Sequence, residues 1–151
     1  MKVAIALGSN LGDRRAHLAF AVAELSKLLK ELRVSSILES DPQDVPDVQP
    51  RYLNAVVVGK TDLEPAALLE QLMAIERARG RERGSFRSAR TLDLDIVLFG
   101  DRIVNTPALE IPHPRFRNRA FVLDGLAELE PDWVDPVSGR TVLELRTRQR
   151  A

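Results

Sequence analysis

The chain contains no cysteine, which excludes disulfide bonds, thiolate metal sites and a cysteine nucleophile. The default prediction for its location is therefore a reducing compartment, the cytoplasm. The chain also carries no net charge, because 22 basic residues balance 22 acidic ones. A neutral molecule has no general attraction for nucleic acid or anionic lipid, so neither is expected as a partner.

Long apolar runs are missing as well. The first run, Val3–Leu7, stops at Gly8 after five residues, which is too short for the apolar region of a signal peptide. No stretch approaches the roughly 18 apolar residues of a membrane span. The glycine-containing segment 8–12 lacks the lysine and the spacing of a Walker A loop. We therefore expect any nucleotide site to depend on arginine and metal.

The length and composition predict a single globular domain over residues 1–151. One hydrophobic core typically serves about 100 to 200 residues. The apolar share of 44% and the charged share of 29% are ordinary for a folded domain. The chain contains neither an internal repeat nor a low-complexity segment, so nothing divides it further.

The hydrophobic periodicity predicts an alternation of strands and helices. Val3–Leu7 predicts a buried strand, and the turn-rich segment after it leads into a helix. The apolar face of that helix would carry Leu18, Val22, Leu25 and Leu29. The later elements are predicted as strands over Leu32–Leu38, Tyr52–Gly59 and Leu92–Phe99, helices over residues 65–80 and Asn118–Leu129, and a hairpin turn at Gly100-Asp101 into residues 102–104. This βαββαβ order predicts an α+β fold of the ferredoxin-like type, with an antiparallel sheet, helices on one face and a C-terminal extension.

Two aspartates in one strand are the strongest sign of chemistry. Alternation in the segment 92–99 would send Leu92, Leu94, Ile96 and Leu98 into the core. Asp93 and Asp95 would then project side by side from the other face, about 6.6 Å apart. Carboxylates so placed suit magnesium, and a pair of such ions clamps both sides of a phosphoryl displacement. An ordinary solvated sheet face is the alternative, but aspartate is unfavourable at strand centres.

An arginine-rich segment precedes this strand. Residues 76–90 contain six arginines against two glutamates, and the planar arginine fork binds phosphate oxygens in pairs. Arg77 and Arg79 are explained by the end of a helix, where cations are favoured. The arginines beyond Gly80 are not, and we expect them to contact a polyphosphate.

A third cluster surrounds His113, which lies between two prolines. That setting predicts a rigid turn, and three arginines follow within six residues. A lone histidine is more often structural, but these neighbours favour a phosphate contact for His113 and Arg119. His17, in the first helix, is interpreted as a surface residue.

Together these motifs resemble the 6-hydroxymethyl-7,8-dihydropterin pyrophosphokinase family of folate biosynthesis. The matching segments, in the order and spacing of the family, are residues 7–12, 52–55, 90–96, 112–113 and 118–121. The resemblance implies an ATP-dependent diphosphotransferase that moves the β- and γ-phosphates of ATP together onto the hydroxymethyl oxygen of the pterin and releases AMP. It also implies that the partners are these two small molecules, with the chain acting as a monomer.

The resemblance implies a role for each matching residue. The catalytic set, in which Asp93 and Asp95 hold two Mg²⁺ ions, is Arg81, Arg90, Asp93 and Asp95. The residues that would face ATP are Glu76, Arg83, Ile96 through its backbone, His113 and Arg119. The residues that would bind the pterin are Pro42, Tyr52, Asn54 and Phe121, with the two aromatic rings on either side of it.

Three segments depart from the family pattern. The pterin-side loop has residues 41–45 where a threonine, two prolines and a glycine are usual. Residues 85–89 replace an Arg-Trp pair, so that Phe86 or Arg87 stands in for the tryptophan. Met73 stands where a glutamine often approaches the nucleotide.

Two other interpretations stay open at this point. An RNA-binding ferredoxin-like domain would stack bases on Tyr52, although Asp93 and Asp95 would repel a phosphate backbone. A relative without activity that binds small molecules is the second, and the intact aspartate pair argues against it. We also predict that segments 40–51 and 80–89 close over bound ATP.

Overall fold

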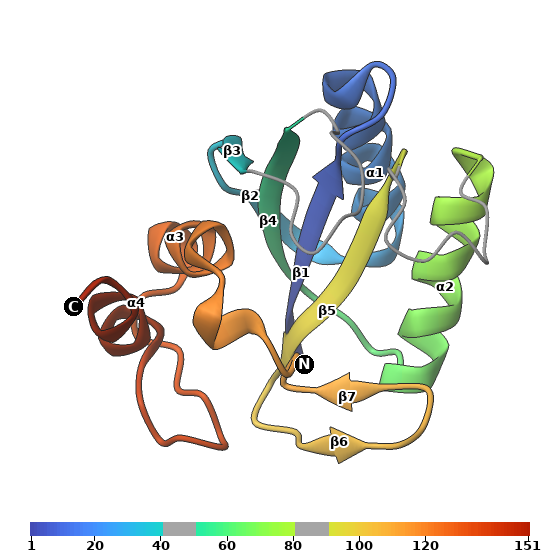
Figure 1. The fold of residues 1–151 in the computed structure, drawn as a ribbon. Helices are drawn as coiled ribbons and strands as arrows, with labels where there is room; N and C mark the ends of the chain where they lie inside the picture. Colours follow the sequence, from blue (N-terminus) through green and yellow to red (C-terminus); the bar gives the residue numbers. More distant parts are fainter. Residues whose placement is uncertain (41–50, 81–90) are drawn as a thin grey trace.

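The computed structural model describes residues 1–40, 51–80 and 91–151, which form an antiparallel sheet between two layers of helices (Figure 1). The elements in chain order are β1 (Lys2–Ser9), α1 (Arg14–Leu28), β2 (Lys30–Val34), β3 (Leu38–Ser40), β4 (Tyr52–Lys60), α2 (Pro65–Ala78), β5 (Asp93–Phe99), β6 (Val104–Asn105), β7 (Glu110–Ile111), the 3-10 helix η1 (Phe116–Asn118), α3 (Ala120–Leu129) and α4 (Val142–Arg150). The main sheet has the order β2-β4-β1-β5, and β3 also pairs with β4. This order and the antiparallel pairing confirm the predicted ferredoxin-like α+β fold. In the described part of the chain, no helix is both long and apolar enough to cross a membrane.

Helices α1 and α2 cover one face of the sheet, as the sequence predicts. Val3, Ile5 and Leu7 of β1 point into this layer, where they pack against Leu25 of α1 and Leu72 of α2. Pro65 occupies the first turn of α2, where its fixed φ is favourable. Gly80 follows the helix with a φ of +80°, in agreement with the predicted end.

The C-terminal extension covers the opposite face. Ala4 of β1 and Val56 of β4 point into this second layer and pack with Leu123 and Leu126 of α3. Trp133 and Val142 close the layer beneath α4. The central strands of the sheet are therefore covered on both faces, and α3 lies against β4, which carries Tyr52 and Asn54 (Figure 1).

The strand predicted over Leu32–Leu38 is instead divided into β2 and β3. Ser35 lies between them and bonds to β4 twice, through its N–H to the carbonyl of Val56 and by accepting the Val56 N–H at its hydroxyl, both at 2.8 Å. The serine hydroxyl thus replaces a backbone carbonyl, and the chain leaves regular strand geometry.

The prediction of a hairpin at Gly100-Asp101 is wrong about which strands pair. The turn exists, with Gly100 at a φ of +55°, but Val104–Asn105 pairs with Glu110–Ile111 rather than with β5. Ile111 is 1% exposed and belongs to the core beneath α1 and α2, as part of a second small sheet. Burial of Ile111, with Val104 packed partly against the same core, outweighs continuation of the main sheet.

A β-bulge in β5 places Leu98 on the opposite face from the one that simple alternation predicts. Ile5 pairs with Ile96 but Ala4 pairs with Leu98, so Val97 is an extra residue. Leu94 and Ile96 stay in the α1/α2 layer, whereas Leu98 turns into the α3/α4 layer. The carbonyl of Val97 accepts the backbone N–H of His113 at 3.0 Å, so the bulged residue anchors the segment that carries the histidine.

Candidate active site

A cavity opens on the α3 side of the sheet. Its lining residues come from β1, β3, β4, β5 and the start of α3: Ala6, Leu7, Gly8, Ser40, Tyr52, Asn54, Asp93, Asp95, Arg119 and Phe121. Its volume of about 160 Å³ is below the roughly 300–1,000 Å³ of sites for drug-sized ligands. It therefore suits one small group, and a larger ligand would extend beyond it.

Strand register places the predicted residues together. Gly8 of β1 pairs with Asn54 of β4 on one side and with Asp93 of β5 on the other. Gly8 leaves the centre of the floor open, since an added Cβ would lie 3.3 Å from the Oδ1 atom of Asn54 and 3.3 Å from Cδ1 of Tyr52. The sequence analysis missed this residue, although a glycine between polar strand neighbours is a sign of close approach.

The side chain of Asn54 is held in one orientation. It is 4% exposed, and its Nδ2 donates to the carbonyl of Leu38 at 3.2 Å and to the Ser40 hydroxyl at 2.8 Å. Both amide hydrogens are therefore used on β3, and Oδ1 remains toward the cavity as an acceptor. Ser40, which the sequence analysis did not single out, is what fixes this orientation.

Tyr52 and Phe121 bring aromatic rings to the cavity from two different elements. Tyr52 begins β4, and Phe121 lies in the first turn of α3. Both are half-buried. Side chains of this kind supply large apolar area for a planar ligand at little cost in conformational entropy.

Asp93 and Asp95 line the same cavity from β5, as alternation predicts. Their partners on β1 are Gly8 and Ala6, whose small size leaves the space in front of the carboxylates open. The Asp95 carboxylate also acts on His113, whose pKa it raises against the effect of burial. The acidic and histidine residues in the described part of the chain form no group of three, so from that part an ion here would have the carboxylates of Asp93 and Asp95. That donor set fits Mg²⁺, which is commonly held by one or two carboxylates plus phosphates.

His113 is neutral and presents an N–H donor. Burial lowers its pKa, Asp95 opposes this change, and Arg119 and Arg115 reinforce it. The backbone N–H of Arg115 donates to Nδ1 at 3.1 Å, so the proton of the neutral ring lies on Nε2. The histidine therefore offers a hydrogen bond to an acceptor oxygen without carrying a positive charge.

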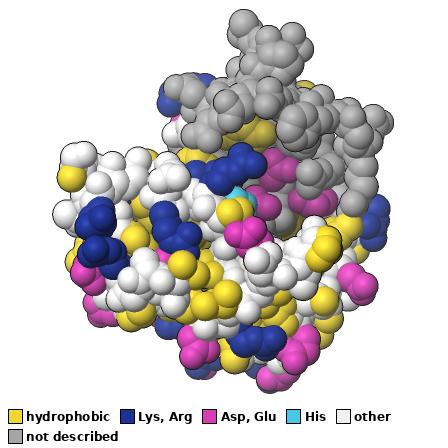
Figure 2. Space-filling model, turned by 60° about the horizontal axis from the view of Figure 1, so that its bottom comes forward, with side chains coloured by type: hydrophobic (Ala, Val, Ile, Leu, Met, Phe, Trp, Pro, Cys, Tyr) yellow, Lys and Arg dark blue, Asp and Glu magenta, His cyan; other side chains and the backbone are white. Residues whose placement is uncertain are grey.

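Arg119 enters the cavity from the N-terminus of α3. Its Nε atom is buried and, within the described ranges, has no hydrogen-bond partner. A buried guanidinium N–H without an acceptor is costly, and an anionic oxygen would satisfy it. Figure 2 shows a histidine, a basic side chain and several acidic side chains gathered beside the grey atoms.

Glu76 and Ile96 lie on the other side of the sheet from the cavity. Glu76 is 5% exposed, and its carboxylate accepts the backbone N–H of Leu94 at 2.8 Å. Ile96 belongs to the core beneath α1 and α2. Here Glu76 joins α2 to β5, so its contact with a nucleoside stays a prediction, as does that of Ile96.

Several predicted features lie outside the described residues. They are the pterin-side Pro42, the phosphate-binding Arg81, Arg83 and Arg90, the substituted segments 41–45 and 85–89, and the closure of the two loops. His17 does lie in the described part, and it is half-buried rather than on the open surface. Its Nδ1 accepts a hydrogen bond from Nε of Arg79 at 3.0 Å, and burial followed by the nearby Arg79 charge lowers its pKa.

Comparison with known proteins gives a consistent family. The family model of 7,8-dihydro-6-hydroxymethylpterin-pyrophosphokinase matches residues 4–131. A 2-amino-4-hydroxy-6-hydroxymethyldihydropteridine pyrophosphokinase of Synechocystis sp. is 43% identical over 143 residues, covering 93% of this chain and 72% of that protein. The protein of that name from Bacillus subtilis is 46% identical over 127 residues, covering 83% and 75% respectively.

Solved structures with the same fold belong to longer chains. The wild-type HPPK-DHPS of Plasmodium falciparum superposes with a TM-score of 0.74 at 16% identity. The match covers 97% of this chain but only 44% of that one, so this chain spans less than half of it. Identity this low supports the fold alone, whereas the family model and the curated relatives identify the sequence. The chain belongs to the 7,8-dihydro-6-hydroxymethylpterin-pyrophosphokinase family.

Proposed function

We propose that this chain transfers pyrophosphate from ATP to the hydroxymethyl group of 6-hydroxymethyl-7,8-dihydropterin and releases AMP, as a step of folate biosynthesis. ATP is the co-substrate of the family to which the chain belongs. The observation that carries the proposal is that a single cavity joins a carboxylate pair to a site for a flat polar ring.

The ring site lies between Tyr52, Asn54 and Phe121. The two aromatic side chains would contact the faces of the pterin, and Oδ1 of Asn54 would accept a hydrogen bond from one of its N–H groups. Because Asn54 is already fixed by β3, little ordering is needed when the ligand binds. The hydroxymethyl arm of the ring would then point toward β5.

The phosphate site lies between β5 and the N-terminus of α3. Arg119 would donate its unsatisfied Nε–H to a phosphate oxygen, and His113 would donate from Nε2. These donors are in place before the reaction and oppose the negative charge that develops during transfer. We propose the same function for Arg81, Arg83 and Arg90, and we retain Glu76 and the backbone of Ile96 as nucleoside contacts and Pro42 as a pterin contact.

Asp93 and Asp95 would hold the metal. Two bound Mg²⁺ ions would neutralise the triphosphate and lower the barrier to attack by the hydroxymethyl oxygen. The contribution of the protein is to keep both carboxylates on one face of a rigid strand, opposite Gly8 and Ala6. This placement also disfavours RNA as the ligand, because the carboxylates repel a phosphate backbone.

The remaining parts of the proposal are that the chain is one domain and acts as a monomer in the cytoplasm, with small molecules as its only substrates. Sedimentation at the concentration used for kinetics tests the monomer directly. A dimer whose dissociation abolishes activity would contradict it.

The reaction is tested by its products. Purified protein is incubated with ATP, Mg²⁺ and the pterin alcohol, and the nucleotides and pterins are separated by chromatography. We expect AMP and the pterin diphosphate in equal amounts, and no AMP without the pterin. Formation of ADP, or AMP release that does not depend on the pterin, would contradict the proposal.

A further inference from the structure

Asp135 is a fully buried carboxylate that does not line the cavity. Its exposed fraction is 0%, and it accepts hydrogen bonds from Nε and Nη2 of Arg117 at 2.6 and 2.9 Å. The Ser138 hydroxyl and the Val137 N–H donate to it at 2.8 and 3.0 Å. A buried charge is tolerated only with such complete pairing, so this cluster is a rigid point of the fold.

The Asp135 carboxylate is ionised at neutral pH. Burial acts to raise its pKa, but the hydrogen bonds from Arg117, Ser138 and the Val137 N–H outweigh burial and lower it. The contact with Arg117 is therefore a two-point ionic pair, which constrains orientation more strongly than a single contact does.

Arg117 belongs to η1, the short turn that leads directly into Arg119. Its guanidinium also lies over the ring of Phe116, 4.7 Å from the centroid, and Phe116 is completely buried. The backbone N–H of Arg119 donates to the Phe116 carbonyl at 3.2 Å. The direction in which Arg119 leaves the turn thus depends on η1, and the pair with Asp135 holds η1 in place.

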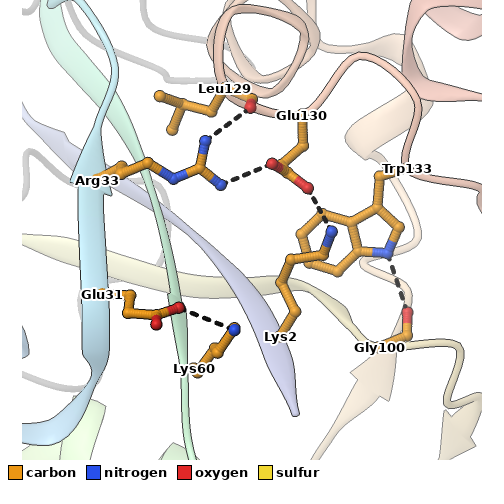
Figure 3. Close-up of polar contacts among 8 residues, drawn as sticks. All are labelled: Lys2, Glu31, Arg33, Lys60, Gly100, Leu129, Glu130 and Trp133. Atoms are coloured by element: carbon orange, nitrogen blue, oxygen red, sulfur yellow. Dashed lines mark hydrogen bonds and ion pairs between the residues drawn. The ribbon is translucent and has the colours of Figure 1, made fainter.

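The other end of α3 is fixed independently (Figure 3). Glu130, just after the helix, pairs with Lys2 of β1 and with Arg33 of β2, and Arg33 also donates to the Leu129 carbonyl at 2.9 Å. These contacts hold the helix body on the sheet. The contacts of Glu130 and Arg33 do not fix the position of η1, the turn that leads into Arg119 just before the first residue of α3.

We propose that Asp135 is a positioning residue for the phosphate site, acting through Arg117 and η1 to keep the Arg119 guanidinium in the cavity. This inference rests on the proposed function, because it assigns the anion at Arg119 to the phosphates of ATP. Asp135 itself touches neither substrate. Its effect falls mainly on the nucleotide, since Tyr52 and Asn54 are held by β3 and β4 and Phe121 belongs to the body of α3, whose far end Glu130 anchors.

The test compares Asp135→Asn with Asp124→Asn. Asp124 is also on α3, but it pairs with Arg146 and Arg150 of α4 at 2.8 and 2.6 Å rather than with an arginine of η1. A misplaced Arg119 loses charge-assisted hydrogen bonds to the bound phosphates, so we expect Asp135→Asn to raise the KM for ATP by about 10- to 100-fold. The KM for the pterin should change less than about twofold, and Asp124→Asn should leave both values unchanged. An equal rise of both KM values in Asp135→Asn would overturn the proposal.

A double-mutant cycle separates positioning from general loss of stability. If Asp135 acts through Arg119, Asp135→Asn should cause no further rise in the KM for ATP in an Arg119→Met background. Multiplicative losses would mean that Asp135 acts by another route. Arg117→Lys, which keeps the charge but loses the two-point contact, gives the same test should Asp135→Asn not fold.

Binding of a non-hydrolysable ATP analogue, measured by calorimetry, makes the test independent of turnover. Weaker binding in Asp135→Asn but not in Asp124→Asn supports the positioning role even if no AMP is formed. Unchanged analogue binding in an active enzyme refutes the positioning role and leaves the proposed function intact.

Discussion

Gly125 of α3 provides a direct test of the packing that closes the cavity. It faces β4, and an added Cβ would lie 2.6 Å from Cγ2 and 2.9 Å from Cβ of Val56. Val56 is 2% exposed and cannot move into solvent. Gly125→Ala should therefore push α3 away from the sheet rather than displace a side chain.

The expected magnitude follows from two opposing effects. Replacing glycine by alanine in a helix interior stabilises it by about 1 kcal/mol. Overpacking a filled core costs about 1–3 kcal/mol, and restoring a normal carbon contact of about 3.6 Å requires a shift of about 1 Å. We expect a net loss of up to about 2 kcal/mol in the free energy of unfolding. The shift also moves Phe121, so the KM for the pterin should rise several-fold.

Urea unfolding of four proteins measures this effect. They are the wild type, Gly125→Ala, Val56→Ala and the double variant, and removal of Cγ2 from Val56 should relieve part of the clash. The double variant should then be more stable than the sum of the single losses by about 0.5–1 kcal/mol. A gain in stability in Gly125→Ala, with no coupling to Val56→Ala, would refute the close packing of α3 on β4.

Two further predictions concern the floor of the cavity and the anchor of α3. Gly8→Ala places a Cβ 3.3 Å from Asn54 Oδ1 and Tyr52 Cδ1, so steady-state kinetics should show a several-fold higher KM for the pterin at an unchanged KM for ATP; equal increases would contradict this reasoning. Glu130→Gln should lower the stability at pH 7 by at most about 1 kcal/mol, because Glu130 is a partly exposed ion pair. Hydrogen bonds from Lys2 and then Arg33, against weak burial, hold the pKa of Glu130 below its ordinary value of 4.5. The stabilisation from the Glu130 ion pairs is therefore fully present above pH 4.5. It is lost as the pH falls through the lower pKa of Glu130 in the folded protein. The difference in the free energy of unfolding between the wild type and Glu130→Gln, measured with urea at pH 7, 4.5 and 3, should therefore shrink as the pH falls. A constant difference would contradict the pairing.

Alternation and register explain why much of the site could be predicted from the sequence. A period of two puts Asp93 and Asp95 on one face of β5, and Tyr52 and Asn54 on one face of β4. Because β1 lies between these strands, the two pairs necessarily face the same cavity. The arginine cluster around His113 already indicated Arg119, and the family resemblance added Phe121; no local pattern connects either residue to the sheet.

The features that could not be predicted depend on tertiary contacts. Ile96 to Phe99 are all apolar, so alternation gives no sign that Val97 is a bulge and that Leu98 changes face. Asp135 lies in a turn-forming segment and meets Arg117, 18 residues earlier, only in the folded chain. His17 occupies a helix position that predicts a surface residue, and its contact with Arg79 arises from the packing of α1 beside α2.

The most direct test of the account is pterin-dependent AMP formation by Asp95→Asn. Asparagine keeps the size of the side chain and the strand but removes the charge that would hold Mg²⁺. We predict that the variant unfolds like the wild type and still binds the pterin, yet forms AMP at least about 100-fold more slowly at saturating ATP and Mg²⁺. Activity within a fewfold of the wild type would contradict the assignment of the β5 carboxylates as the metal site of the reaction.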